Sequence, residues 1–594
     1  FYIQASTILV AAIDFGTTYS GWAYSFRHQY NNDPTKISAK VWSGGKLMSE
    51  KAPTTVLIEP DGKTFKAFGY DAEDMYADLS NKGKHIDWFY FRRFKMLLMD
   101  KISLERGLEL EDETGKKLSA KAVFSMAIRY LKDDLLEDST KRIADMVKPE
   151  DIMWVMTVPA IWNDSAKQFM REAAVEAGIN TNKLKLALEP ETASLFCRLS
   201  PKNRMTGDTY ISKIKEGSKY MVLDAGGGTV DVTVHQVLKG GRLKEVNKAS
   251  GGAWGGGKVD EAYRQFLITI VGKNVFHKFV NNHMDDYLEI IREFELKKRK
   301  IEPVKDSNVL GTEHTKPQDE STENVVIRFP LALKEVFAKE TGENLETTIT
   351  QTVHSGQIEL VGDKLKVDAR IMRRFFEEAT KNIVDHIKML FSNPAVKDVH
   401  AILMVGGFSE SKMLQHAIRK EFRTITVIVP HDAGMVVLKG AVVFGHDPGA
   451  ISERIAKYTY GMAKCKKFIE GEHDKRYKII NHDGIVKCDN IFGKHVEIGQ
   501  SLKCDESFQH KYHAPGSKAT RFVARLFATV NKNPKYVTDV GCFRVGEMRV
   551  DVDTSVPYKD RSFIISLSFG DTEIHIKAVE KSGRETTCTL NCLE

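Results

Sequence analysis

Hydrophobic and polar positions divide the chain into two parts with different periods. Over residues 1–447, short apolar runs alternate with longer stretches whose apolar residues recur at helical spacing, which is typical of an α/β fold. The predicted strands of this part are residues 8–13, 154–158, 220–223 and 401–405. The predicted helices are residues 118–136, 165–177, 285–301, 368–391, 410–422 and 434–444.

Beyond residue 457 the pattern changes to short segments in which apolar and polar residues alternate. Turn residues separate these segments, which include residues 522–530, 548–552 and 563–569. Such a pattern predicts antiparallel β structure. We therefore expect an α/β domain over 1–447, a linker over 448–457 and a smaller all-β domain over 458–594.

One segment of the first domain has a different composition from the rest. Residues 303–324 contain no aromatic side chain and are mostly polar or charged, which predicts an exposed insertion.

Charge and composition exclude several classes of function. The net charge is +7 over 594 residues and no basic tail dominates, so nothing favours nucleic acid or an anionic membrane as a partner. No apolar run approaches the roughly 18 residues that a membrane span needs. The seven cysteines are scattered without zinc-site spacing, so we expect reduced thiols and a cytoplasmic location.

A near-repeat is the most informative feature of the first domain. One copy covers residues 9–18 and the other residues 220–231. In each copy a strand ends in an aspartate, Asp14 or Asp224, and glycine and hydroxyl residues follow before a second strand. The copies are far enough apart for each to begin one of two similar lobes.

Residues of these types suit a phosphate site. Glycine turns let backbone N–H groups come close to phosphate oxygens, and threonine hydroxyls add donors. A carboxylate repels bare phosphate, so Asp14 and Asp224 facing one cleft imply Mg²⁺ held mostly through water. For either copy alone, an unrelated glycine-rich hairpin is the alternative.

Three further features fit a nucleotide cleft. Glu189 stands just before a proline that can begin a helix, where a carboxylate can be aimed into a cleft or simply cap the helix. The predicted strand 401–405 ends at a glycine pair on which a nucleoside could lie flat. Glu295, Lys298 and Arg299 share one helix face, which is either a surface ion-pair face or a site where a guanidinium stacks on a purine.

Two other kinds of nucleotide motif are missing. Gly62, Lys63 and Thr64 look like the end of a P-loop, but Leu57 stands where that motif needs its first glycine. The chain also has no protein-kinase catalytic loop.

The order of these pieces resembles the superfamily of actin, sugar kinases and heat-shock ATPases. Within it, residues 13–20, 157–160 and 224–231 resemble the 70-kDa heat-shock family, and the resemblance extends over about residues 8–447 and more loosely beyond. Details resembling the atypical member-12 branch of that family are residues 168–174, 227–236, 405–408 and 569–574.

The resemblance implies a two-lobed RNase-H-like, actin-like ATPase domain followed by a smaller all-β domain. It implies ATP or ADP and Mg²⁺ as ligands, with K⁺ as a further candidate. The implied catalytic residues are Asp14, Glu189, Asp224, Thr229, Asp231 and Arg93, with Asp14 and Asp224 holding the metal mostly through water. The implied phosphate-turn residues are Gly16, Thr17, Thr18, Tyr19, Gly226, Gly227 and Gly228. Those around the adenosine are Glu295, Lys298, Arg299, Gly406, Gly407, Phe408, Glu410 and Asp432.

The chain also departs from the pattern of typical members. Their catalytic lysine has no clean counterpart in residues 91–95, where alignment favours Arg93 and Lys95 is the second choice, so we expect slow hydrolysis. Glu410 and Phe408 replace an adenine-stacking arginine and a serine, which leaves base affinity open. The linker is polar and we expect no helical lid after the β domain, so coupling between the domains is open too.

These features predict an ATP-binding, slowly hydrolysing, atypical chaperone. Its expected partners are ATP or ADP and peptide or unfolded-protein clients on the β domain. Two alternatives are a non-hydrolysing scaffold gated by nucleotide and a small-molecule kinase of the same superfamily.

Overall fold

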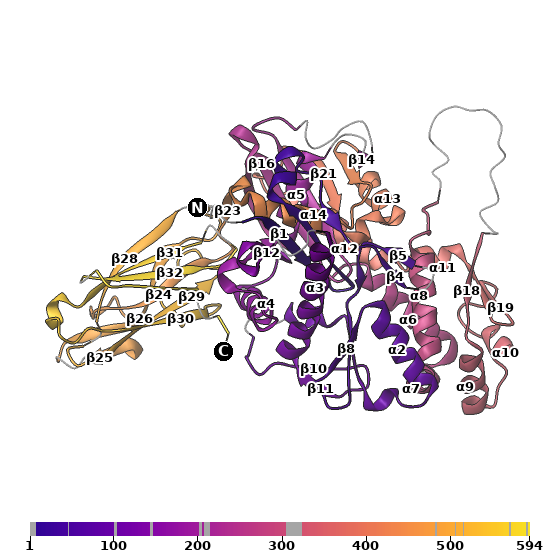
Figure 1. Cartoon of the computed structure of the whole chain (residues 1–594). Coiled ribbons are helices and arrows are strands. Elements are labelled where there is room, and N and C mark those ends of the chain that lie inside the picture. The colour runs from indigo at the N-terminus through magenta and orange to yellow at the C-terminus, as the bar shows by residue number, and fades with distance from the viewer. Residues whose placement is uncertain are drawn as a thin grey trace.

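The computed structural model describes residues 7–44, 47–99, 104–142, 147–200, 205–206, 214–304, 323–480, 484–504, 506–514, 516–569, 572–581, 583–589 and 592–593. The α/β part has two lobes, each built on a sheet of the same topology. In each lobe an antiparallel hairpin supplies the middle of the sheet, and two strands that come later in the chain add in parallel on one side. Figure 1 shows this part beside an elongated β domain.

The sheet of lobe I has the order β13-β12-β1-β2-β3, with β6 also paired to β2. Its strands are β1 (Leu9–Asp14), β2 (Tyr19–Phe26), β3 (Ser38–Ala39), β6 (Ala52–Pro53), β12 (Ile152–Val158) and β13 (Leu184–Leu188). Helices α3 (Ala120–Arg142) and α4 (Asp164–Glu176) contact this sheet. A smaller sheet, β8-β7-β9, is formed by Phe65–Phe68, Thr55–Ile58 and Phe89–Arg92.

The sheet of lobe II has the order β14-β22-β21-β15-β16-β17-β23-β27. Its strands are β14 (Met205–Thr206), β15 (Lys219–Ala225), β16 (Val230–Val237), β17 (Leu243–Gly252), β21 (Val399–Val405), β22 (Thr426–Pro430), β23 (Ile451–Ile455) and β27 (Ser501–Lys503). Its helices include α6 (Gly257–Val271), α7 (Lys273–Asn282), α8 (Met284–Lys298), α9 (Leu331–Thr341), α12 (Glu377–Phe391) and α13 (Lys412–Glu421). A small sheet, β18-β20-β19, is formed by Asn324–Arg328, Lys364–Asp368 and Ile358–Val361.

Two helices pack against each other at the junction of the two lobes. These helices, α5 (Glu189–Leu199) and α14 (Val436–His446), share one buried apolar cluster with residues of both large sheets. A Cβ on Gly440 would lie 1.8 Å from the carbonyl oxygen of Thr192, so only glycine allows this close crossing. Helices α2 (Tyr70–Asn81) and α8 form a second contact between the lobes, where Arg292 pairs with Glu73 at 2.7 Å.

The predicted strands are confirmed, and most predicted helices lie close to their expected bounds. The predicted helix 368–391 is two helices, α11 (Ala369–Arg374) and α12. The start of the predicted helix 410–422 belongs to a 3-10 turn, Gly407–Glu410, that precedes α13. Of the predicted insertion 303–324, residues 305–322 lie outside the described residues.

The β domain consists of two antiparallel sheets. One has the order β25-β26-β24-β29-β30, from Lys478–Ile480, Val486–Val496, Thr459–Lys467, Arg521–Thr529 and Phe543–Asp551. The other has the order β28-β31-β32-β33, from Ser507–His513, Ser562–Ser568, His575–Glu580 and Glu585–Thr589. Alternate apolar side chains of both sheets, such as Leu526 and Ile565, share one buried cluster. This is the architecture of a β-sandwich.

The segment expected to be a linker contains a strand of the lobe II sheet. Within it, β23 pairs in parallel with β17 and antiparallel with β27, so the sheet continues into the β domain. Its polar residues make the contacts: the Arg454 guanidinium forms two bonds of 2.8 Å to the buried Glu191 carboxylate. The Ile455 N–H donates to Glu245 at 2.8 Å. Ion pairs and hydrogen bonds therefore hold this segment against lobe II. An apolar linker would instead be held by burial of its hydrophobic side chains.

The β domain also contacts lobe I through α4. Arg171 pairs with Glu573, and the Thr572 hydroxyl donates to the Leu186 carbonyl at 2.8 Å. Arg171, Thr572 and Glu573 come from the two distant motifs, 168–174 and 569–574, that resemble the member-12 branch. None of the helices in the described ranges is long and apolar enough to cross a membrane.

Candidate nucleotide-binding site

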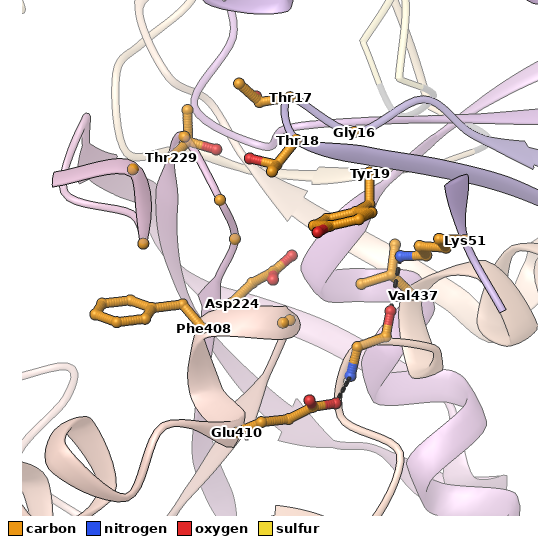
Figure 2. Close-up of a pocket in the computed structure, with 18 of the residues that line it drawn as sticks. Gly16, Thr17, Thr18, Tyr19, Lys51, Asp224, Thr229, Phe408, Glu410 and Val437 are labelled. Atoms are coloured by element: carbon orange, nitrogen blue, oxygen red, sulfur yellow. Dashed lines mark hydrogen bonds between the residues drawn. The ribbon is translucent and has the colours of Figure 1, made fainter. Parts of the chain in front are cut away.

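A cavity of about 540 Å³ lies between the two lobes. Its lining includes the first turn (residues 14–19), the second turn (residues 224–229), one face of α8 and the glycine pair after β21. Figure 2 shows labelled side chains of both turns around one space with Lys51, Phe408 and Glu410. Of the residues predicted from the sequence, all except Arg93 and Asp231 line the cavity.

The first turn is tight because its backbone folds back on itself. A Cβ on Gly16 would lie 2.1 Å from the carbonyl oxygen of Tyr19, so the position requires glycine. The Thr54 hydroxyl donates to the Gly16 carbonyl at 2.8 Å, and the Gly16 N–H donates to the Ser20 hydroxyl at 3.1 Å. These bonds hold the loop open toward the cavity at Thr17 and Thr18.

The second turn is supported by another glycine run at the start of α6. N–H groups of Gly255, Gly256 and Gly257 donate to the three carbonyls of residues 226–228 at 2.7–3.2 Å. A Cβ on Gly255 would lie 2.6 Å from the Gly226 carbonyl oxygen. We did not predict this support from the sequence, although the glycine-rich run 251–257 is a visible signal of it.

The two turns touch each other across the cavity. A Cβ on Gly227 would lie 2.0 Å from the Thr18 hydroxyl oxygen, and one on Gly228 would lie 2.8 Å from that of Thr17. The structure therefore brings the two copies of the near-repeat together, with no room for a side chain at either glycine.

Asp14 at the end of β1 is buried but compensated. The Lys51 ammonium lies 2.6 Å from one of its carboxylate oxygens, and the Thr157 hydroxyl donates to the other at 2.7 Å. Burial alone would raise the pKa of Asp14, but the charge and hydrogen bond of Lys51, the hydrogen bond of Thr157 and the charge of Lys95 together hold the pKa below its ordinary value.

Asp224 at the end of β15 is equally buried and uncompensated. Its Oδ2 atom has no hydrogen-bond partner among the described residues. Burial first, and then the neighbouring charges of Glu189 and Asp231, raise the pKa of Asp224 well above its ordinary value. A buried carboxylate oxygen without a partner fits a nearby cation.

The carboxylates of the described residues do not form a direct metal cage. No group of three or more His, Cys, Asp or Glu side chains in those ranges is arranged to hold a metal ion. The unpaired oxygen of Asp224 therefore fits a hydrated Mg²⁺ that keeps most of its water, as this ion prefers.

The lysine in the cleft is Lys95, the second choice of the sequence analysis. Its ammonium lies 2.9 Å from a Glu189 carboxylate oxygen, and its side chain is only 3% exposed. Arg93 pairs with Asp260 at 2.6 Å and is not among the residues that line the cavity. The sequence could not separate the two, because they are two residues apart at the start of a 3-10 turn, Phe94–Leu98.

Asp231 lies behind the second turn. One carboxylate oxygen accepts the Ile161 N–H at 3.0 Å, and the other has no partner among the described residues. Burial first, and then the charge of Glu189, raise the pKa of Asp231 to about 7.

The other end of the cavity, which we call the base end, combines ionic and aromatic side chains. Lys298 pairs with Asp260 and Glu295, and the Arg299 guanidinium lies over the Tyr19 ring at 5.8 Å. This face of α8 is therefore both an ion-pair face and part of the cavity.

Two residues that depart from the typical family pattern also line the base end. The Phe408 ring stacks on Phe376 at 6.4 Å between centroids. A Glu410 oxygen accepts the Gly434 N–H at 3.0 Å. Nearby, Asp432 pairs with Lys439 at 2.6 Å.

Lys51 is the lining residue that the sequence analysis missed most completely. It lies on a short polar turn between β5 (Leu47–Ser49) and β6, and no motif distinguishes it from other lysines. Only its position in the fold brings it to Asp14.

Comparisons with known proteins agree with this geometry. A family model described as Hsp70 protein matches residues 92–329. Heat shock 70 kDa protein 12A of Homo sapiens is 32% identical over 637 residues, which cover 97% of this chain and 90% of that protein. Heat shock 70 kDa protein 12B of Homo sapiens is 32% identical over 640 residues, covering 98% and 90%. The stromal 70 kDa heat shock-related protein of Pisum sativum is 22% identical over 472 residues, covering 76% and 55%. The chain therefore belongs to the 70-kDa heat-shock protein family and is similar to its member 12.

Proposed function

We propose that this protein binds ATP and ADP with Mg²⁺, hydrolyses ATP slowly and acts as an atypical chaperone whose β domain holds peptide clients. The observation that carries the proposal is the cavity in which both glycine turns face Lys95, Glu189 and Asp224. A polyphosphate needs backbone and hydroxyl donors together with nearby positive charge, and this arrangement offers both.

Each residue at the end of the cavity that the two turns form, which we call the turn end, has a definite task in this proposal. Thr18 and Thr229 donate to phosphate oxygens. Lys95 supplies a point charge beside the phosphoryl group that is transferred. Glu189 lines the cavity and orients the attacking water, while Asp231, buried behind the second turn with one oxygen on the Ile161 N–H, supports that turn. Positioning and charge neutralisation account for most catalysis of this kind.

Asp224 is the residue that would hold the metal ion through its water. Mg²⁺ bound there would neutralise and polarise the phosphate oxygens. The carboxylate itself costs free energy in its buried, unpaired state, so it gains most from a cation.

The docked linker supports a link between the cavity and the β domain. Arg454 binds Glu191, which lies two residues after Glu189 on α5. A shift of α5 at Glu189 would therefore move the Arg454 contact of β23. Because β23 pairs with β27, the shift would also reach the β domain. We keep peptide or unfolded-protein clients, and a cytoplasmic location, as part of the proposal; Cys197, Cys465, Cys488 and Cys542 are free thiols.

The test is isothermal titration with ATP and ADP in Mg²⁺, with phosphate release followed on the same sample. We expect binding of both nucleotides and slow release. Asp224→Asn should lower turnover by about 100-fold. Thr229→Val should lower it less. Asp61→Asn, on an exposed turn, is the matched control and should leave turnover unchanged.

A second pair of variants tests which basic residue serves the chemistry. Lys95→Met should lower turnover strongly, whereas Arg93→Met should have a smaller effect through its pair with Asp260. Binding without any phosphate release would instead favour the nucleotide-gated scaffold. Absence of binding to either nucleotide would contradict the proposal altogether.

A further inference from the structure

Lys51 joins the two lobes at the turn end of the cavity. Its ammonium donates to Asp14 of lobe I at 2.6 Å and to the Gly434 carbonyl of lobe II at 2.7 Å. The Gly434 N–H in turn donates to Glu410 at the base end, and dashed lines in Figure 2 mark this bond and the bond from Lys51 to the Gly434 carbonyl. Lys51 therefore occupies a fixed place between the phosphate turns and the base end.

The carboxylates around Lys51 outnumber the ammonium groups that pair with them. At the turn end, Asp14 is paired with Lys51 and Glu189 is paired with Lys95, while Asp224 has an unpaired oxygen. The ammonium groups of Lys51 and Lys95 therefore each pair with one carboxylate. An anion that enters the cavity would meet both lysines at close range.

Lys51 also retains hydrogen-bonding capacity. An ammonium has three N–H donors, and two of them are used by Asp14 and Gly434. No described residue accepts from the third. The side chain is 16% exposed and lines the cavity, so the remaining donor is available to a ligand there.

We propose that Lys51 is a direct ligand of the phosphate chain of the nucleotide, in addition to the counter-ion of Asp14. A compact ammonium is a strong phosphate donor, and desolvation in a cavity strengthens the contact. This inference rests on the proposed function, because it names a residue that distinguishes nucleotides by their phosphates at the same site.

The experiment compares affinities along the series adenosine, AMP, ADP and ATP for the full chain, by competition against a fluorescent ADP analogue. Lys51→Met should lower affinity for ADP and ATP at least tenfold and affinity for adenosine less than twofold. Lys51→Arg keeps the charge and should stay within about threefold of the wild type for every ligand. Thermal unfolding of each variant checks that it is folded.

Lys219→Met is the matched control. Lys219 is not among the residues that line the cavity, its side chain is 17% exposed, and its ammonium bonds one carboxylate, Asp398 at 2.8 Å, and one backbone carbonyl, Ala395 at 3.1 Å. The same loss of charge at this site should change affinity for adenosine and for ADP by less than twofold. If Lys51→Met fails to fold, Lys51→Gln replaces it with the same expectation, because glutamine keeps a donor for Gly434.

Two results would overturn the inference while leaving the proposed function intact. One is an equal loss of affinity for adenosine and ADP, which would mean that Lys51 acts only through the Gly434 segment. The other is an unchanged series in the variant while the wild type binds ADP. If the wild type binds neither ADP nor ATP, the proposed function fails and this inference fails with it.

Discussion

The first and second turns of the cavity are alike in backbone and opposite in charge balance. Both follow the first strand of a lobe's central hairpin, β1 or β15, and a buried aspartate is the last or next-to-last residue of that strand. Asp14 has Lys51 at 2.6 Å, whereas Asp224 has neighbouring carboxylates and an oxygen without a described partner. A repeat in sequence therefore reproduced the backbone of the site and left its electrostatics to residues outside the repeat.

This difference in pairing implies different roles for the two aspartates. The compensated Asp14 is ready to stabilise the fold, because its charge is satisfied without a ligand. The uncompensated Asp224 stores an unfavourable free energy that a cation can relieve. Buried groups with strongly shifted pKa values are common at binding and catalytic sites of proteins.

The largest expected effect comes from the same substitution made in each turn. Asp14→Asn leaves the Lys51 ammonium without its carboxylate and should lower the free energy of unfolding by about 3 kcal/mol. Asp224→Asn removes a carboxyl group whose ionisation is opposed by burial and by neighbouring carboxylates, so it should raise this free energy. Thermal unfolding of the ligand-free proteins measures both.

A control separates the ion pair from other effects at Asp14. The double variant with Asp14→Asn and Lys51→Met should recover part of the lost stability, because no charge is then left alone. Equal destabilisation by Asp14→Asn and Asp224→Asn would contradict the comparison.

A smaller effect is expected where the turns touch. Gly227→Ala places a Cβ 2.0 Å from the Thr18 hydroxyl, so the turns must separate. We expect nucleotide affinity to fall about tenfold, or about 1.4 kcal/mol. Titration calorimetry measures this, with Gly107→Ala as the control because a Cβ there meets nothing within 4 Å. An unchanged affinity in Gly227→Ala would mean that the nucleotide does not need the contact between the turns.

The smallest effect is the pH dependence of stability, and its sign differs between the turns. The raised pKa of Asp224 means that the folded state keeps a proton that the unfolded state releases above about pH 4, so this contribution falls as pH rises. The lowered pKa of Asp14 gives stability that is present above about pH 4 and lost as pH falls. Each slope is at most about 1.4 kcal/mol per pH unit.

Melting temperatures of the ligand-free variants against pH test these signs. The advantage of Asp224→Asn over the wild type should grow as pH rises from 4. The disadvantage of Asp14→Asn should shrink as pH falls below 4. Parallel curves for the two variants would show that both aspartates have the same environment.

Much of the fold followed from local pattern in the sequence. The places where a strand leads into a glycine turn, at Asp14, Asp224 and Gly406, predicted where the cavity residues would lie, because glycine lets the backbone turn sharply there. The alternation beyond residue 457 predicted the β domain, because period-two patterning suits a sheet with one buried face. The motifs also predicted the family to which the chain belongs.

The sequence by itself thus determined the two lobes, the two turns and the family, because each depends on residues that are neighbours in the chain. Only the tertiary structure decided that Lys95 rather than Arg93 reaches Glu189, that Lys51 reaches Asp14, and that the polar linker docks through Arg454. These contacts join residues 37 to 263 positions apart. A long charged side chain has many possible partners along a sequence, and only the packing of the lobes selects one.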